Sequence, residues 1–267
     1  MLLYIVSPMV YNYSIYNSVS ENDKMHILIA NDDGIFAPGI RALANAAKAA
    51  GHRVTVFAPD SQRSAASHAF TLKKPLRAVP VEYEDGITAF AVDGTPADCV
   101  RLGLYLTRED PVDCVLSGIN NGSNRGAAIL YSGTVAAVFE AAALGMKAIA
   151  VSTEPKAIST AWEELDRIWE FFCKHELLQK HSIYNVNIPR NAGAIRITRQ
   201  GGPYYSDDFL PEENDMYRPQ GKPVYAPSND CLDTDTVLTR KEISVMPLTI
   251  QRVDMAAYEA LQTLNEA

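Results

Sequence analysis

From residue 25 to about residue 153, short apolar runs alternate with longer segments whose apolar positions recur at helical spacing. Apolar runs of roughly four to eight residues between turn residues are typical of buried strands. We expect strands at residues 25–30, 54–58, 88–92, 113–117 and 148–152. Strands that alternate with helices predict an α/β fold with a mostly parallel sheet.

The helices expected between these strands have recognisable ends. Residues 38–50 begin at Pro38 and are followed by Gly51, as helices often are. Thr95 is suited to cap a helix that continues through Pro96 to about residue 106. An Ala-rich helix is expected after Ser132, and the 160–163 stretch has the form of a capping box for a helix to about residue 175.

Beyond residue 183 the pattern changes, because Pro, Gly, Tyr and Asp become frequent. Short β-like runs are predicted at residues 184–188, 194–198, 235–238 and 243–246. We interpret residues 190–250 as hairpins and long excursions attached to the core. With a C-terminal helix, residues 190–267 are expected to form an oligomerisation arm.

Residues 1–24 differ from the rest, since residues 1–20 contain no charged residue. No basic segment precedes the apolar residues 2–6, so a secretory signal fits poorly, and this run is too short to span a bilayer. We interpret residues 1–24 as a disordered leader or the product of an upstream start codon.

Composition narrows the function classes. The 267 residues are 47% hydrophobic and 21% charged, with a formal net charge of -8. That charge argues against a nucleic-acid polymer or a membrane surface as partner. The four cysteines, Cys99, Cys114, Cys173 and Cys231, have neither C-x-x-C nor zinc-site spacing, which predicts a reduced, cytoplasmic protein.

The first strand ends in Asn31-Asp32-Asp33-Gly34. Two adjacent carboxylates repel each other unless a positive charge lies between them, and Mg²⁺ and Mn²⁺ prefer oxygen ligands. A metal site is one interpretation. The alternative is an Asp-rich turn that caps the next helix.

Other loops at the same edge are also polar. In open α/β sheets, ligands bind outside the carboxyl ends of the strands. The stretches that follow strands there are Pro59-Asp60 with residues 62–68, Asp93-Gly94-Thr95-Pro96, and residues 117–126. The opposite edge has no comparable cluster in the sequence, so a ligand site at this edge is expected.

Together these stretches resemble the SurE family of metal-dependent nucleotidases, the survival-protein-E acid phosphatases. The matching stretches are Asn31-Asp32-Asp33-Gly34, Ala58-Pro59-Asp60, Arg63-Ser64-Ala65, residues 94–99, Ser117-Gly118-Ile119-Asn120 with Gly122 and Asn124, and Ser132-Gly133-Thr134. Order and spacing match over residues 25–153. The resemblance is thinner at 185–189, 234–235, 243–245 and 247–248, and residues 1–24 have no counterpart.

The resemblance implies a Rossmann-like core, here residues 25–189, and a β-rich C-terminal arm exchanged between subunits of a homodimer or homotetramer. It also implies one Mg²⁺ or Mn²⁺ per subunit, held by Asp32, Asp33, Ser64 and Asn120. Carboxylate, hydroxyl and amide oxygens suit such an ion. Ser64 could instead bond its own backbone, and Asn120 could simply form a turn.

The Ser132-Gly133-Thr134 stretch predicts a phosphate-binding helix start, because free N–H groups and the helix dipole favour anions there. A simple N-cap is compatible with that role. Asn124 is a candidate phosphate contact or a turn former. His68 is a candidate general acid or a solvated side chain, and Arg63 and Arg125 could offset phosphate charge or lie on the surface.

The expected function is hydrolysis of nucleoside 5′-monophosphates by a metal-activated water, with Asp32, Asp33 and Asn120 as catalytic residues. Nucleoside 3′-monophosphates and short polyphosphate are candidate further substrates. An aspartyl-phosphate route lacks the D-x-D spacing, and a dehydrogenase lacks G-x-G-x-x-G. A non-catalytic metal- and nucleotide-binding protein remains the alternative.

Overall fold

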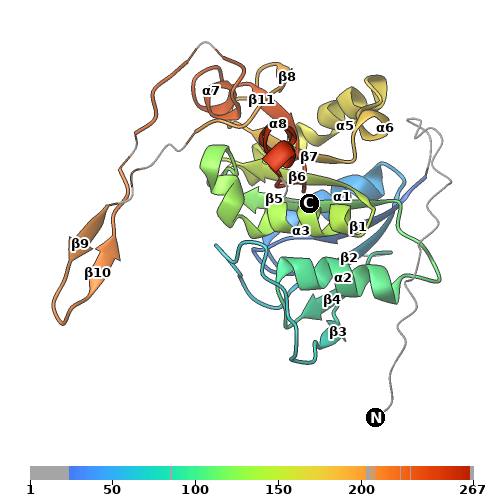
Figure 1. Ribbon diagram of the computed structural model, residues 1–267. Helices are drawn as coiled ribbons and strands as arrows, with labels where there is room; N and C mark the ends of the chain where they lie inside the picture. The colour runs from blue at the N-terminus through green and yellow to red at the C-terminus, as the bar shows by residue number, and fades with distance from the viewer. Residues whose placement is uncertain are drawn as a thin grey trace.

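The structure, a computed structural model, describes residues 24–264 apart from residues 85, 203–205, 207, 223 and 229. Residues 1–23 of the expected leader therefore lie outside the described residues. Nine of the described strands form one sheet in the order β3-β4-β2-β1-β5-β6-β7-β11-β8 (Figure 1). They are β1 (His26–Ala30), β2 (Arg53–Pro59), β3 (Ala78–Pro80), β4 (Thr88–Val92), β5 (Cys114–Asn121), β6 (Lys147–Thr153), β7 (Ile183–Ile188), β8 (Ile195–Ile197) and β11 (Ile243–Pro247).

The central strands run parallel, from β4 through β2, β1, β5 and β6 to β7. Antiparallel strands flank this block, since β3 pairs with β4 and β11 pairs with β7 in that sense. The mostly parallel α/β sheet predicted from the sequence is thus confirmed. The strands β8 and β11 from the predicted arm continue the same sheet.

Helices cover both faces of the sheet (Figure 1). In chain order they are α1 (Pro38–Ala49), α2 (Pro96–Leu106), the 3₁₀ helix η1 (Gly126–Tyr131), α3 (Gly133–Ala143), α4 (Ile158–Glu163), α5 (Leu165–Lys174), α6 (Leu177–Lys180), α7 (Asp233–Leu238), α8 (Met255–Leu261) and the 3₁₀ helix η2 (Gln262–Leu264). None of those in the described part of the chain has the length and apolarity needed to cross a bilayer.

The alternation of side chains along β1 divides the core into two layers. Ile27 and Ile29 pack with α1 and α5 on one face, whereas Leu28 packs with α2 and α3 on the other. All of these side chains are buried. A strand that is apolar on both faces must lie in the middle of the sheet, and this position places its carboxyl end at the centre of one edge.

The helix ends agree with the sequence in three cases. Thr95 caps α2 in a capping box with Asp98, and Pro96 occupies the first turn. Ser132 caps α3 by accepting a hydrogen bond from the Val135 N–H at 3.1 Å. The helix α1 begins at Pro38 as expected.

Two sequence expectations were wrong. Thr160 lies inside α4 and caps nothing, because the Ala157 N–H bonds to the Glu154 carbonyl and the helix begins directly after this turn. A second helix, α5, starts after the break at Glu164. The 235–238 run is helical rather than extended, with Asp233 and Asp235 in the first turn of α7, where acidic residues are favourable.

Between β8 and α7 the chain leaves the sheet for an excursion, residues 202–230. Its described part contains a small antiparallel hairpin of β9 (Phe209–Pro211) and β10 (Tyr217–Pro219). Figure 1 shows this hairpin standing away from the sheet. The chain returns at a neck, residues 199–201 and 231–233, where Arg199 and Leu232 form a β-bridge.

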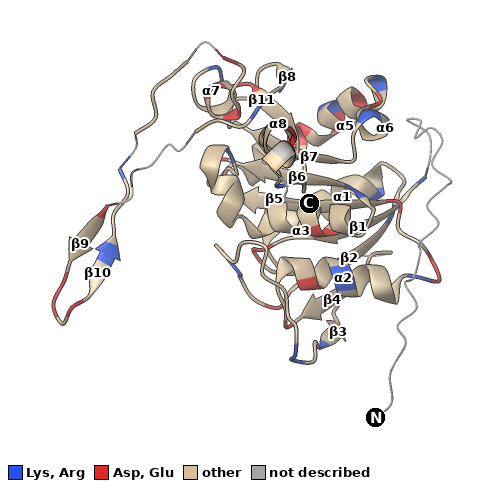
Figure 2. Cartoon of the chain, viewed as in Figure 1, with Lys and Arg blue, Asp and Glu red and all other residues tan. Residues whose placement is uncertain are grey.

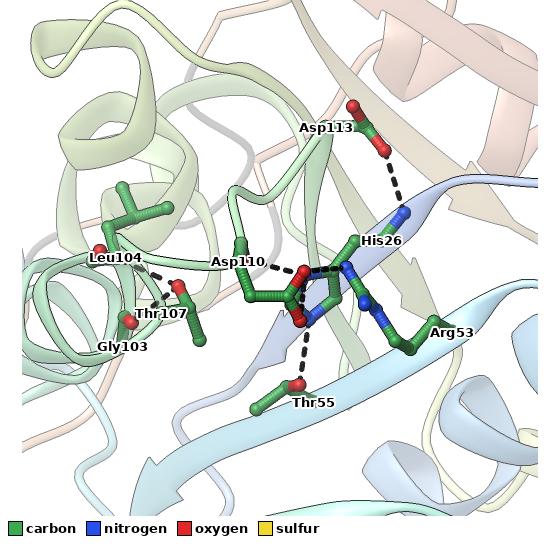
Figure 3. Close-up of polar contacts among 8 residues, drawn as sticks. All are labelled: His26, Arg53, Thr55, Gly103, Leu104, Thr107, Asp110 and Asp113. Carbon is green, nitrogen blue, oxygen red and sulfur yellow. Dashed lines mark hydrogen bonds and ion pairs between the residues drawn. The ribbon is translucent and has the colours of Figure 1, made fainter.

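Charges are interspersed along the elements, as Figure 2 shows, and the hairpin carries both signs. At the amino edge of the sheet, buried His26 contacts the Asp110 carbonyl through Nδ1 at 3.0 Å and the Thr55 hydroxyl through Nε2 at 2.8 Å (Figure 3). Asp113 accepts a hydrogen bond from the His26 N–H at 2.7 Å. These contacts fit the structural role expected for a histidine inside a strand.

Candidate active site

Four segments meet at the carboxyl edge of the sheet around the end of β1. The Arg63 N–H in the β2–β3 loop bonds to the Asp32 carbonyl at 2.7 Å. The Asn121 N–H at the end of β5 bonds to the Asp33 carboxylate at 3.2 Å. The Thr134 hydroxyl at the start of α3 bonds to the Asp32 carboxylate at 2.5 Å. The structure therefore brings together the segments that the sequence placed at this edge.

The turn after β1 is built by Asn31, whose side chain is buried. Its Nδ2 donates to the Gly34 carbonyl at 2.9 Å, and its Oδ1 accepts from the Gly34 N–H at 3.2 Å. Gly34 has a φ of 101°, which favours glycine. Asn31 thus closes a rigid turn that presents Asp32 and Asp33, a role that the sequence motif alone did not assign.

Asp32 is a buried carboxylate against the start of α3. A Cβ on Gly133 would lie 2.8 Å from the Asp32 Cβ and 3.0 Å from its Oδ2, so only glycine allows this approach. Burial raises the pKa of Asp32, the Thr134 hydrogen bond opposes the rise, and the Asp33 charge adds to it. The site therefore holds a carboxylate whose negative charge is poorly compensated.

Asp33 and Ser64 are linked by Gln62. The Gln62 amide donates to Ser64 Oγ at 2.9 Å and approaches Asp33 Oδ1 at 3.4 Å. Ser64 is exposed and Asp33 is half-buried, so both face the solvent side of the site. In the sequence Gln62 is only one member of a polar loop, because nothing in its spacing shows that its amide joins two predicted ligands.

A bulge in β5 sets the orientation of the Asn120 side chain. Ser117 pairs with Ala150 and Asn120 pairs with Ser152, so β5 has one more residue than β6 over this interval. The Asn120 Nδ2 donates to the Gly122 carbonyl at 2.7 Å. This bond engages the nitrogen end of the amide and leaves Oδ1 without a partner among the described residues. The strand expected at residues 113–117 therefore continues to Asn121 and includes Asn120.

The donor set fits a hard divalent cation. It offers two carboxylates, a hydroxyl and an amide oxygen, and Asp32 and Asp33 form no ion pair with a described basic residue. No cluster of three or more His, Cys, Asp or Glu residues suited to a metal occurs in the described part of the chain. Any such ion at this site would therefore rely on two carboxylates and neutral oxygens.

The start of α3 supplies anion-binding groups beside Asp32. The Ser132 Oγ is used as a cap, and the Ala136 N–H bonds to the Ser132 carbonyl. The Gly133 N–H donates to no described residue, whereas both the N–H and the hydroxyl of Thr134 bond to the Asp32 carboxylate. Unpaired N–H groups at a helix start favour a phosphate or carboxylate. Here the backbone N–H of Gly133 is free for an anion.

This chain is similar to known proteins in both sequence and fold. A family model described as Survival protein SurE matches residues 27–207, more than half of the chain. The chain belongs to the SurE family. The resemblance inferred from the motifs is thereby confirmed.

Individual SurE relatives are similar over nearly their whole length. A protein of Caldanaerobacter subterraneus named 5′-nucleotidase SurE is 40% identical over 258 residues, which cover 91% of this chain and 97% of that protein. One from Pelobacter propionicus with the same name is 40% identical over 253 residues, with 90% and 99% covered. A crystal structure of a SurE protein from Aquifex aeolicus has a TM-score of 0.76 at 32% identity and covers 90% of this chain and 100% of that one.

Asn124 lies deeper in this SurE-family site than its predicted phosphate contact requires. Its Nδ2 donates to the Ser152 hydroxyl at 2.9 Å. Its backbone N–H and carbonyl bond to Asn187, and its carbonyl also accepts from Asn185 Nδ2 at 2.7 Å. These bonds fasten the loop after β5 to β6 and β7.

His68 is held away from the start of α3. Its Nε2 lies 2.8 Å from the Glu140 carboxylate, which also pairs with Arg101. Glu140 lies about two helical turns, roughly 10 Å, beyond Gly133. The structure therefore gives no support to His68 as a general acid. Arg63 pairs with the Asp60 carboxylate at 3.1 Å, and Arg125 precedes η1.

Proposed function

We propose that this chain is a divalent-metal-dependent 5′-nucleotidase that hydrolyses nucleoside monophosphates to nucleoside and phosphate. The observation that carries the proposal is the Asp32–Asp33 pair, which has no basic partner among the described residues and whose Asp32 lies beside the free Gly133 N–H at the start of α3. A cation and an anion are both needed to satisfy these groups. A divalent cation held by the carboxylates, together with the phosphate of a monoester substrate, would provide both.

The proposed metal ligands are Asp32, Asp33, Ser64 and Asn120. The oxygen donors suit one Mg²⁺ or Mn²⁺ ion per subunit. When bound, such an ion supplies positive charge and lowers the pKa of a coordinated water. The Gln62 amide orients Ser64 and Asp33, and the Gly122 carbonyl orients Asn120 by fixing which end of its amide is free.

The proposed chemistry at the substrate rests on two groups. Asp32 orients the attacking water and accepts its proton, because its carboxylate is adjacent to the start of α3, where the phosphate is proposed to bind. There the free Gly133 N–H, supported by the Ser132 cap, stabilises charge on the phosphate oxygens, and the phosphate contact predicted for Thr134 stays a proposal. Asn124 contributes by fixing the loop that follows Asn120, and its predicted direct phosphate contact stays a proposal.

The arm is proposed to be exchanged between the subunits of a homodimer or homotetramer. An isolated two-stranded hairpin is marginally stable in water. The hairpin of β9 and β10 exposes Phe209, Leu210, Met216 and Tyr217. Packing against a second subunit would cover these side chains. The free described cysteines support the proposal of a reduced, cytoplasmic location.

Phosphate release from AMP tests the proposed activity. We expect turnover with Mn²⁺ or Mg²⁺ that stops on addition of EDTA and returns with excess metal. Glucose 6-phosphate, which has a phosphate monoester but no base, is the matched comparison, and 3′-AMP tests positional preference. Tight metal and AMP binding without phosphate release would instead favour the non-catalytic alternative.

A further inference from the structure

One buried carboxylate joins the neck to the active-site loop. Asp233 has no exposed surface. Its oxygens accept hydrogen bonds from three backbone N–H groups, those of Gly126, Gly201 and Thr234, each at 2.7 Å. These donors come from the start of η1, the first segment of the neck and the start of α7 itself. A single side chain thus fastens the start of α7 to two other segments.

The neck holds Gly126 by both of its backbone groups. Asp233 accepts from the Gly126 N–H, and the Gln200 Nε2 donates to the Gly126 carbonyl at 3.0 Å. The fit in the neck is close, because a Cβ on Gly201 would lie 2.3 Å from the Thr234 hydroxyl oxygen and 3.0 Å from Asp233 Oδ1. Gly126 is therefore fixed by contacts to residues on both sides of the excursion.

Gly126 leads directly to the phosphate-binding helix start. The 3₁₀ helix η1 runs from Gly126 to Tyr131 and is followed by Ser132, the cap of α3. The Tyr131 carbonyl also accepts a hydrogen bond from Ser67 in the loop that carries Ser64. A shift of η1 therefore moves the cap of α3 and strains the contact to the β2–β3 loop.

We propose that Asp233 and Gln200 are positioning residues for the nucleotidase reaction. They act through Gly126 and η1 to hold the start of α3, with its free Gly133 N–H, where the substrate phosphate binds. The position of the neck therefore affects the affinity for phosphate. The arm thus contributes to the active site as well as to the proposed oligomer. This inference rests on the proposed function.

Asp233→Asn tests the inference in the full chain. Asparagine keeps the size of the side chain but places an N–H₂ group among three N–H donors, so at least one hydrogen bond is lost. Asp235→Asn is the matched control. Asp235 is equally buried in the same helix, but its carboxylate accepts from Ser228 and Tyr225 and has no contact with Gly126.

We expect Asp233→Asn to raise KM for AMP and the inhibition constant of inorganic phosphate by about 2- to 30-fold, as for other indirect couplings. The calorimetric Mn²⁺ affinity should change little, because none of the proposed ligands contacts Asp233. Gln200→Ala should have the same effect in smaller degree. Asp235→Asn should leave all three constants near those of the unmodified chain.

Amide hydrogen exchange on the metal-free chain gives a readout independent of activity. Asp233→Asn should speed exchange at residues 126–134 more than Asp235→Asn does, although both variants loosen α7. Equal exchange at residues 126–134 in the two variants, or equal phosphate affinities, would overturn the positioning role. Failure of the unmodified chain to hydrolyse AMP would overturn the proposed function while leaving the exchange result intact.

Discussion

Asp32 and Asp33 are adjacent, yet their surroundings differ. Asp32 is buried between β1 and α3, whereas Asp33 is half-buried and faces Gln62 and Asn121. In the absence of a cation the two charges repel each other, and burial makes the charge on Asp32 still more costly. The fold therefore carries a local electrostatic cost that a bound divalent ion would remove.

Asp33→Asn tests this cost together with the site. We expect loss of Mn²⁺-dependent turnover, and a metal-free melting temperature equal to or above that of the unmodified chain, because one of two repelling charges is gone. Differential scanning calorimetry with EDTA and an AMP assay measure the two effects. Asp166→Asn removes a carboxylate exposed on α5 and serves as the control. Near-normal activity of Asp33→Asn would show that the site is assigned wrongly.

Ser132 and Thr134 are expected to have separable roles. Thr134→Val keeps the side-chain shape but removes a hydrogen bond to the Asp32 carboxylate, which typically costs about 1.5–3 kcal/mol. It should weaken Mn²⁺ binding measured by calorimetry. Ser132→Ala removes the cap, which costs about 1 kcal/mol, and should lower kcat/KM with little change in Mn²⁺ affinity. The same Mn²⁺ affinity in both variants would argue against the orienting role of Thr134.

The candidate site could be foreseen from the sequence only in part. The segments were predictable, because parallel strands end at one edge and ligands bind there. Side-chain directions were not, because they depend on tertiary contacts. The Thr134 hydroxyl points to Asp32 only because Gly133 allows α3 to approach, and Gln62 joins Asp33 to Ser64 only once the β2–β3 loop has folded back.

At the scale of elements, α3 carries two different polar functions. Its first turn faces Asp32, and two turns later Glu140 pairs with His68 and Arg101 although its side chain is almost fully buried. Burial tends to raise the pKa of Glu140, but the bonds from His68 and Arg101 outweigh it, so the pKa is lowered. Glu140 thus ties the β2–β3 loop and α2 to the same helix whose start is the proposed phosphate site.

Glu140→Gln gives a pH-dependent prediction. A carboxyl whose pKa is lowered by folding stabilises the folded state above its ordinary pKa of 4.5, and this stabilisation is lost as the pH falls through the lowered value. At pH 7 the variant should be destabilised by about 1.5–3 kcal/mol, the usual worth of a hydrogen bond to a charged group.

Urea unfolding at pH 7 and at pH 3.5 measures the difference between the two chains, which should shrink at the lower pH. Glu163→Gln, an exposed substitution on α4, should show no such difference at either pH. A gap that stays constant with pH would mean that the loss comes from packing and not from charge.

The elements themselves were predictable where local signals and burial agree. Thr95, Pro96 and Asp98 all favour a helix start, and α2 begins there. The 235–238 run was wrongly predicted as a strand because it has few apolar residues. Its helical conformation depends on tertiary contacts, the hydrogen bonds that Asp233 accepts from Gly126 and Gly201. Short segments of this kind take their conformation from contacts that the local pattern does not contain.

At the scale of the whole molecule, the described part of the excursion has few stabilising contacts of its own, because its hairpin does not pack on the sheet. The hairpin of β9 and β10 exposes large apolar side chains and stands away from the sheet in Figure 1. The helix α8 likewise exposes Met255, Tyr258 and Leu261 along one side. Several large apolar side chains exposed on one element are more typical of an interface than of a free surface.

Light scattering at micromolar concentration should report at least a dimer. The double variant Phe209→Ser, Tyr217→Ser should shift the mass towards the monomer, because both side chains are largely exposed on the hairpin. Tyr105→Ser, on the exposed side of α2, is the control and should leave the mass unchanged. A monomeric unmodified chain would contradict the proposed exchange of the arm.

The hydrogen bond between Gly126 and Asp233 can form only late in the synthesis of the chain. The proposed metal ligands all precede residue 121, whereas Asp233 follows Gly126 by 107 residues. At ordinary elongation rates this interval lasts about 5–20 s. A nascent chain therefore holds every proposed ligand before it holds the carboxylate that fixes Gly126. Full phosphate affinity is expected only once the excursion has left the ribosome, so truncated chains should bind metal yet hydrolyse nucleotides poorly.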